Sequence, residues 1–155
     1  MIYVIGGTGM VGTQIAKTVN GKAVSRSTGV DATKPMPFLQ GQVVINCVGY
    51  APYKLDHDAT IKVIKRIIEA KPKRIVHISA WKANEQSVIP YLKAKGTIER
   101  LLRESKIPCL IIRPKVIDCK QAQLGLLRYL FPRTKLSTLT KYVKDNMHRD
   151  GVVDL

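Results

Sequence analysis

Short apolar runs rich in β-branched residues alternate along the chain with longer segments in which apolar residues recur every three or four positions. The short runs are typical of buried parallel strands, and the longer segments are typical of amphipathic helices. The pattern predicts strands at 2–5, 22–25, 29–32, 42–48, 74–79 and 108–112, and helices at 11–19, 55–70, 90–105, 121–131 and 137–147. This alternation predicts an α/β fold: a Rossmann-type, doubly wound, mostly parallel sheet with helices on both faces.

The connection between the third and fourth predicted strands differs from the rest of the pattern. Pro35 and Pro37 exclude a long helix there, so we expect only a turn. The chain has 155 residues, which is enough to bury a core without disulfides or metals. We therefore expect a single domain over 1–155, with its core at about 1–118 and a short helical extension at 119–155.

The first predicted strand leads directly into a glycine turn. Gly6, Gly9 and Gly12 follow it in a GxxGxxG spacing, and a helical pattern begins at Val11. Gly6 would allow a tight turn, Gly9 would let the backbone approach a pyrophosphate, and Gly12 would let the helix pack on the strand. Free N–H groups and the dipole at the helix N-terminus would then favour the anion. The alternative is a turn that binds nothing, but the flanking strand and helix favour a dinucleotide site.

The second predicted strand ends in Ser25 and Arg26, where dinucleotide-binding folds often carry an acid for the adenosine ribose. An arginine can instead hold a 2′-phosphate through two hydrogen bonds. These residues predict NADP(H) as the preferred cofactor, with NAD(H) as the alternative. Asp31 follows at a position from which its carboxylate could meet the adenine edge. The alternative is that Arg26 is a solvent-exposed arginine in a turn and binds no ligand.

Ser79, Tyr91 and Lys95 form a candidate catalytic set. Ser79 ends the strand at 74–79, and Tyr91 and Lys95 lie one helical turn apart. A nearby ammonium lowers the pKa of a tyrosine, which can then exchange a proton with a carbonyl or alcohol while a nicotinamide exchanges hydride. The lysine would also hold the nicotinamide ribose, and the serine would hydrogen-bond the substrate oxygen. This spacing arises readily by chance in a lysine-rich chain, so a solvated pair is the alternative.

The composition narrows the class of partner. The chain has 26 Lys and Arg against 11 Asp and Glu, a net charge of +15, which suits an anionic cofactor, an anionic membrane surface or an acidic protein. The basic residues are scattered and aromatics are few, which disfavours direct nucleic-acid binding. No stretch approaches the roughly 18 apolar residues of a transmembrane segment. The three cysteines have no CxxC spacing and no paired histidines, so we expect no metal site and a reducing compartment.

Five segments recur in order and spacing in a known superfamily. They are Gly6–Gly12 (GGTGMVG), Ile45–Gly49 (INCVG), His77–Ala80 (HISA), Tyr91–Lys95 (YLKAK) and Ile112–Pro114 (IRP). Together they resemble the atypical or extended short-chain dehydrogenase/reductases over about residues 1–118. The resemblance is greatest to the NmrA-like NAD(P)H-binding branch, which includes the NADPH-binding accessory subunit of mitochondrial complex I and related coenzyme Q-biosynthesis proteins.

The resemblance implies a cofactor site and a catalytic set. The cofactor site would consist of Gly6, Thr8, Gly9, Met10, Val11, Gly12, Ser25, Arg26, Asp31, Val48, Gly49, Lys95 and Pro114. The catalytic set would be Ser79, Tyr91 and Lys95. The chain departs from the superfamily in two respects: the third helix is nearly absent, and the tail after Pro114, which usually builds the substrate pocket, is short.

Two functions follow from these features. The intact serine, tyrosine and lysine favour an NADP-dependent oxidoreductase of a small carbonyl or quinone-like substrate. The short tail and the charge of +15 favour a non-catalytic NADPH-binding subunit or assembly factor, docked on a larger complex by its basic surface or its C-terminal helices. A nucleic-acid or regulatory binder that senses NADP has no motif of its own. The compartment would be the mitochondrial matrix or the cytoplasm.

Overall fold

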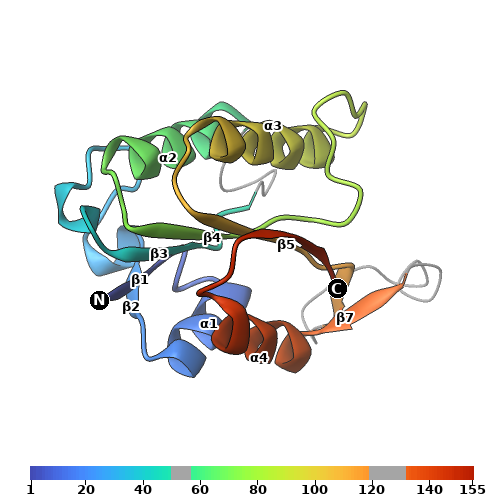
Figure 1. Ribbon diagram of the computed structural model, residues 1–155, viewed down its shortest axis with the longest axis horizontal. Helices are drawn as coiled ribbons and strands as arrows, with labels where there is room; N and C mark the ends of the chain where they lie inside the picture. The colour runs from blue at the N-terminus through green and yellow to red at the C-terminus, as the bar shows by residue number, and fades with distance from the viewer. Residues whose placement is uncertain (50–56, 119–131) are drawn as a thin grey trace.

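The computed structural model describes residues 1–49, 57–118 and 132–155. Across these residues the main feature is a six-stranded sheet in the order β2-β1-β3-β4-β5-β8 (Figure 1). All its neighbouring strands run parallel. The strands are β1 (Ile2–Ile5), β2 (Lys22–Val24), β3 (Val43–Asn46), β4 (Arg74–Ile78), β5 (Cys109–Arg113) and β8 (Gly151–Asp154). The predicted doubly wound parallel fold is confirmed.

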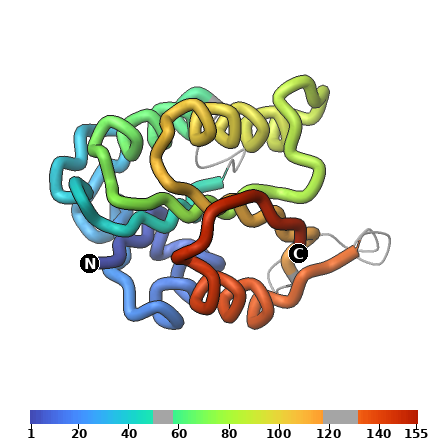
Figure 2. The backbone as a smooth tube through the Cα atoms, viewed as in Figure 1, coloured from blue at the N-terminus to red at the C-terminus, as the bar shows by residue number. Residues whose placement is uncertain are grey.

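Helices cover both faces of the sheet, as predicted. The described helices are α1 (Met10–Val19), α2 (His57–Glu69), α3 (Pro90–Glu104) and α4 (Leu136–Asn146). Helices α1 and α4 pack on one face, and α2 and α3 pack on the other (Figures 1 and 2). Successive residues of β4 show the alternation, because Ile75 is buried under α2 and α3 and Val76 under α1 and α4. Burial on both faces explains the continuous apolar runs in the sequence.

The strand order places a crevice beside β1. The chain passes from β1 to β2 on one side and then crosses to β3 on the other side. In open parallel sheets, ligands bind outside the carboxyl ends of the strands at such a reversal point. The carboxyl ends of β1 and β3 therefore mark the expected location of a cofactor.

The strand predicted at 29–32 is wrong. Gly29 adopts a left-handed conformation (φ 82°) that ends a 3₁₀ turn over Arg26–Thr28, and the Asp31 carboxylate accepts hydrogen bonds from the backbone and hydroxyl of Thr33. These local bonds hold a compact turn instead of an extended strand. The prediction of a reduced connection is confirmed, because a three-residue 3₁₀ turn at Pro37–Leu39 stands where the third helix would be.

The C-terminal part is not purely helical, contrary to the prediction. Residues Gly151–Asp154 form β8, which pairs with β5 and completes the sheet. Two further short strands, β6 (Val116–Asp118) and β7 (Arg133–Lys135), pair with each other. The helix predicted at 137–147 is confirmed as α4, which packs beside α1. The helix predicted at 121–131 lies outside the described residues.

Gly12 provides a test of how this fold is assembled. A Cβ at Gly12 would lie 2.1 Å from the carbonyl oxygen of Gly6, whereas a Cβ at Gly9 would meet only that same oxygen at 3.3 Å. We expect Gly12→Ala to lower the free energy of unfolding by about 1–3 kcal/mol, because the helix must move off the turn. Gly9→Ala is the matched control and should unfold near the wild-type midpoint. Urea unfolding with equal midpoints for the two variants would contradict this packing.

Candidate functional site

The glycine turn has the tight bend predicted at Gly6 and the close helix packing predicted at Gly12. Gly6 is left-handed (φ 76°), Gly9 caps the N-terminus of α1, and Gly12 packs against Gly6. Gly7 was not singled out in the sequence, yet a Cβ there would lie 2.8 Å from Cα of Ala23. The turn therefore holds both the start of α1 and the end of β2 against β1.

A pocket of about 540 Å³ lies on the β2 side of this turn. Its walls contain predicted cofactor residues, namely Gly6, Thr8, Gly9, Ser25, Arg26, Asp31, Val48 and Gly49. Ser27 was not predicted, but its hydroxyl lies 2.8 Å from that of Ser25 and donates to the Thr8 hydroxyl at 3.3 Å. The pKa of Asp31 is lowered by hydrogen bonds from Thr33, mainly from its backbone N–H and then from its hydroxyl. Asp31 therefore contributes a carboxylate to the lining of this pocket.

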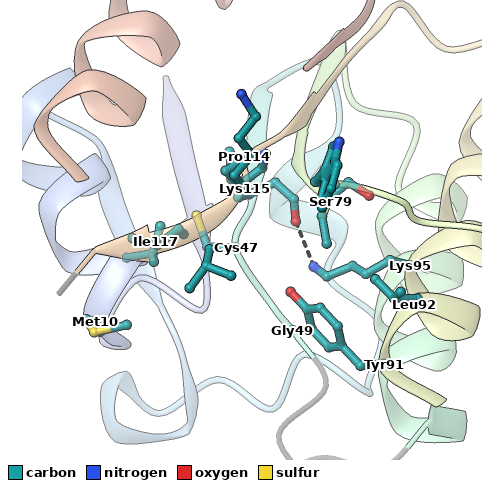
Figure 3. Close-up of a pocket in the computed structure, with 15 residues that line it drawn as sticks. Met10, Cys47, Gly49, Ser79, Tyr91, Leu92, Lys95, Pro114, Lys115 and Ile117 are labelled. Atoms are coloured by element: carbon teal, nitrogen blue, oxygen red, sulfur yellow. Dashed lines mark hydrogen bonds between the residues drawn. The ribbon is translucent and has the colours of Figure 1, made fainter. Parts of the chain in front are cut away.

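A second pocket, of about 520 Å³, lies on the β4 and β5 side of the turn. It is lined by the predicted residues Met10, Val11, Gly49, Ser79, Tyr91, Lys95 and Pro114, and by apolar residues such as Trp81, Leu92 and Ile117. In Figure 3, Tyr91 and Lys95 enter from α3, and Met10 and Ile117 lie across from them. Cys47 and Gly49 line both pockets, so the two pockets adjoin at the carboxyl ends of the strands, and together they are called the cleft below.

Lys95 is buried at the centre of this second pocket. Its ammonium donates hydrogen bonds to the carbonyl oxygens of Ile78 at 2.7 Å and Val48 at 3.3 Å (Figure 3 shows the first). Only 3% of the residue is exposed. Burial lowers the pKa of Lys95 to about 8. Lys95 therefore joins the ends of β3 and β4 to α3.

Tyr91 is placed as predicted, but its pKa moves in the opposite direction. We expected the Lys95 ammonium to lower the pKa of the phenol; instead burial raises it, although 37% of the residue stays exposed. The hydrogen bonds described for Lys95 go to backbone carbonyls, and desolvation of the phenol is therefore the dominant effect. Tyr91 is consequently a protonated phenol at neutral pH.

Ser79 belongs to a network that the sequence prediction missed. Its hydroxyl donates to the carboxylate of Glu99 at 2.5 Å, and Arg113 binds the same carboxylate through two hydrogen bonds of 3.0 and 2.6 Å. Only 1% of Glu99 is exposed. The bond to Glu99 uses the hydroxyl hydrogen that Ser79 would offer to a substrate oxygen. The available signal was the four-residue spacing of Tyr91, Lys95 and Glu99 along one face of a helix.

The described residues contain neither a metal site nor a membrane-spanning helix. No group of three His, Cys, Asp or Glu side chains there is arranged to hold a metal ion. In the same parts of the chain, no helix has both the length and the apolar character needed to cross a bilayer.

Comparison with known sequences gives one partial relationship. No family model matches the chain. The protein FMP52, mitochondrial, of Kluyveromyces lactis is 45% identical over 49 residues. The match covers 31% of this chain and only 21% of that protein, so it spans about a fifth of the relative's length.

Comparison with solved structures identifies the fold. A protein described as an NAD-dependent epimerase/dehydratase from Bacillus halodurans superposes with a TM-score of 0.74 at 16% identity, covering 97% of this chain and 90% of that one. A small-chain dehydrogenase in complex with NADPH superposes with a TM-score of 0.65 at 16% identity, covering 100% and 96%. The chain therefore has the Rossmann-type fold seen in NAD(P)-dependent epimerases and short-chain dehydrogenases.

The buried lysine predicts a specific dependence of stability on pH. Between the folded pKa of about 8 and the unfolded value of roughly 10.4, the unfolded chain holds a proton at Lys95 that the folded protein has released. Stability from this group therefore rises with pH across that window. Relative to Lys95→Met, the wild-type protein should gain roughly 2 kcal/mol of unfolding free energy between about pH 7.5 and 10. Urea unfolding curves whose difference stays constant over this range would contradict the burial of the ammonium.

Proposed function

We propose that the protein is an NADP(H)-dependent oxidoreductase of a small carbonyl or quinone-like substrate. The observation that supports this most is that two pockets of complementary chemistry adjoin at Cys47 and Gly49. One half contains the glycine turn and Arg26, and the other half presents Tyr91 and Lys95 beside largely apolar walls. A dehydrogenase of nearly the same length, solved with NADPH, supports a nicotinamide cofactor in a chain this short.

The residues of the first pocket fit a dinucleotide with a 2′-phosphate. Gly9 has space around its Cα at the N-terminus of α1, so a pyrophosphate can approach the backbone. At the end of β2, residues 25–28 supply hydroxyl and guanidinium donors and no carboxylate. Arg26 would bind the 2′-phosphate, with the hydroxyls of Ser25 and Ser27 beside it. When bound, the cofactor would supply or accept the hydride.

The residues of the second pocket have distinct roles in this proposal. Tyr91, whose phenol is protonated at neutral pH, donates its proton to the substrate oxygen during reduction. The Lys95 ammonium, fixed by two carbonyl oxygens, holds the nicotinamide ribose. Met10, Trp81 and Leu92 line the space where the substrate would lie and favour an apolar molecule over a sugar.

The second candidate is a non-catalytic NADPH-binding subunit or assembly factor. The bond from Ser79 to Glu99 favours it, because it removes one donor from the predicted catalytic set. The net charge of +15 suits docking on an acidic protein surface. The resemblance to the NmrA-like branch supports a respiratory complex as the partner, and the partial match to a mitochondrial protein supports a location in mitochondria.

Cofactor preference tests the role of Arg26. We expect the wild-type protein to bind NADPH more tightly than NADH, because charge-assisted bonds to a phosphate contribute about 1.5–3 kcal/mol. Arg26→Asp should erase or reverse the preference. Lys17→Asp makes the same charge change on an exposed position of α1 and should preserve it. Calorimetry that finds equal wild-type affinity for both cofactors would contradict the assignment.

Turnover separates the two candidate functions. If Tyr91 is the proton donor, Tyr91→Phe should reduce the rate of NADPH oxidation by about 10²–10⁴ and leave NADPH affinity unchanged. A panel of aldehydes, ketones and quinones assayed with both proteins measures this. Equal rates for wild type and Tyr91→Phe on every substrate would reject the oxidoreductase and leave the non-catalytic subunit.

A further inference from the structure

We propose that Glu99 is a positioning residue for the nicotinamide half of the cleft. Through Ser79 and Arg113 it fixes α3 across the ends of β4 and β5, and so sets the places of Lys95 and Pro114. This inference rests on the proposed cofactor site. It gives Ser79 a positioning role in place of the substrate contact predicted from the sequence.

The carboxylate of Glu99 connects three elements of the fold. It receives a hydrogen bond from Ser79, directly after β4, and a fork of two from Arg113, the last residue of β5. Arg103, one turn further along α3, lies 3.5 Å from the same carboxylate. Because a fork between guanidinium and carboxylate defines both distance and orientation, it fixes the helix more narrowly than apolar packing does.

Ser79 lines the second pocket, and Glu99 and Arg113 each lie close along the chain to a residue that also lines it. Lys95 precedes Glu99 by one helical turn, and Pro114 directly follows Arg113. The backbone N–H of Ser79 donates to the Ile112 carbonyl oxygen at 2.8 Å, which ties the ends of the two strands together. A displacement of Glu99 would therefore move both the ammonium and the proline wall of the pocket.

The network also has a cost that favours a functional interpretation. Glu99 is a charged residue on the face of α3 that packs Ile98 and Leu102 into the core, where an apolar side chain would fill the space without desolvation. Its charge acts on Lys95 as well: burial lowers the pKa of Lys95, and the carboxylate of Glu99 opposes that effect. Glu99 thus favours the charged form of the ammonium that would hold the ribose.

The test compares two probes that occupy different lengths of the cleft. Adenosine 2′,5′-bisphosphate would fill only the pocket with the glycine turn and Arg26, whereas NADPH would reach both pockets. We expect Glu99→Gln to weaken NADPH binding roughly tenfold, since a misplaced binding group loses its contacts. The fragment should bind within about twofold of wild type, because its contacts are distant. A variant that fails to fold would instead bind both probes more weakly.

The matched control is Glu104→Gln, the same substitution on an exposed residue of α3 that pairs with Arg100. It should leave both affinities unchanged. Ser79→Ala and Arg113→Lys provide milder tests if Glu99→Gln does not fold, and each should lower NADPH affinity without affecting the fragment. A wild-type protein that binds neither probe would reject the proposed function and this inference with it. The inference alone would be overturned if the wild-type protein binds both probes while Ser79→Ala, Arg113→Lys and any folded Glu99→Gln variant bind NADPH as tightly as the Glu104→Gln control does.

Discussion

The close packing of α1 on the glycine turn is the constraint on which the other features of the cleft depend. At Gly12 the helix backbone comes so near the Gly6 carbonyl that no side chain can be accommodated. This contact sets the N-terminus of α1 at the carboxyl end of β1, the strand at which the strand order switches from one side to the other. Gly7 likewise leaves no room for a side chain against Ala23 of β2. Both pockets therefore open from one short turn, with Cys47 and Gly49 shared between them.

Helices α2 and α3, which pack on the face of the sheet opposite α1, differ in the side chains that they bury. Helix α2 contributes apolar side chains such as Ile64 and Ile67 to the core, as its pattern predicts. Helix α3 contributes Ile98 and Leu102 to the same core but also buries Lys95 and Glu99. Buried charges destabilise a fold unless hydrogen bonds satisfy them. Here backbone carbonyls satisfy Lys95 and a bidentate arginine satisfies Glu99, and Lys95 is the one of the two that lines the cleft.

Elements whose residues repeat over many positions could be predicted from the sequence, whereas features set by one or two contacts could not. The glycine turn and the helix of Tyr91 and Lys95 were predicted, because the spacing of residues close together in the sequence indicates both. β8 was missed because its sequence, Gly-Val-Val-Asp, has only two apolar residues in a row. The partners of Glu99 are separated by 20 and 14 residues, so only the folded chain brings them together. The predicted direction of the Tyr91 pKa shift was wrong, because the shift depends on burial, which the spacing of residues does not reveal.

Cys47 lies at the junction of the two pockets, where a bound dinucleotide would pass closest to a thiol. Burial raises the pKa of that thiol to about 12, so the side chain is a neutral thiol at neutral pH. Peroxides and electrophiles react with the thiolate form. Cys47 therefore borders both pockets as a small, polarizable side chain of low reactivity.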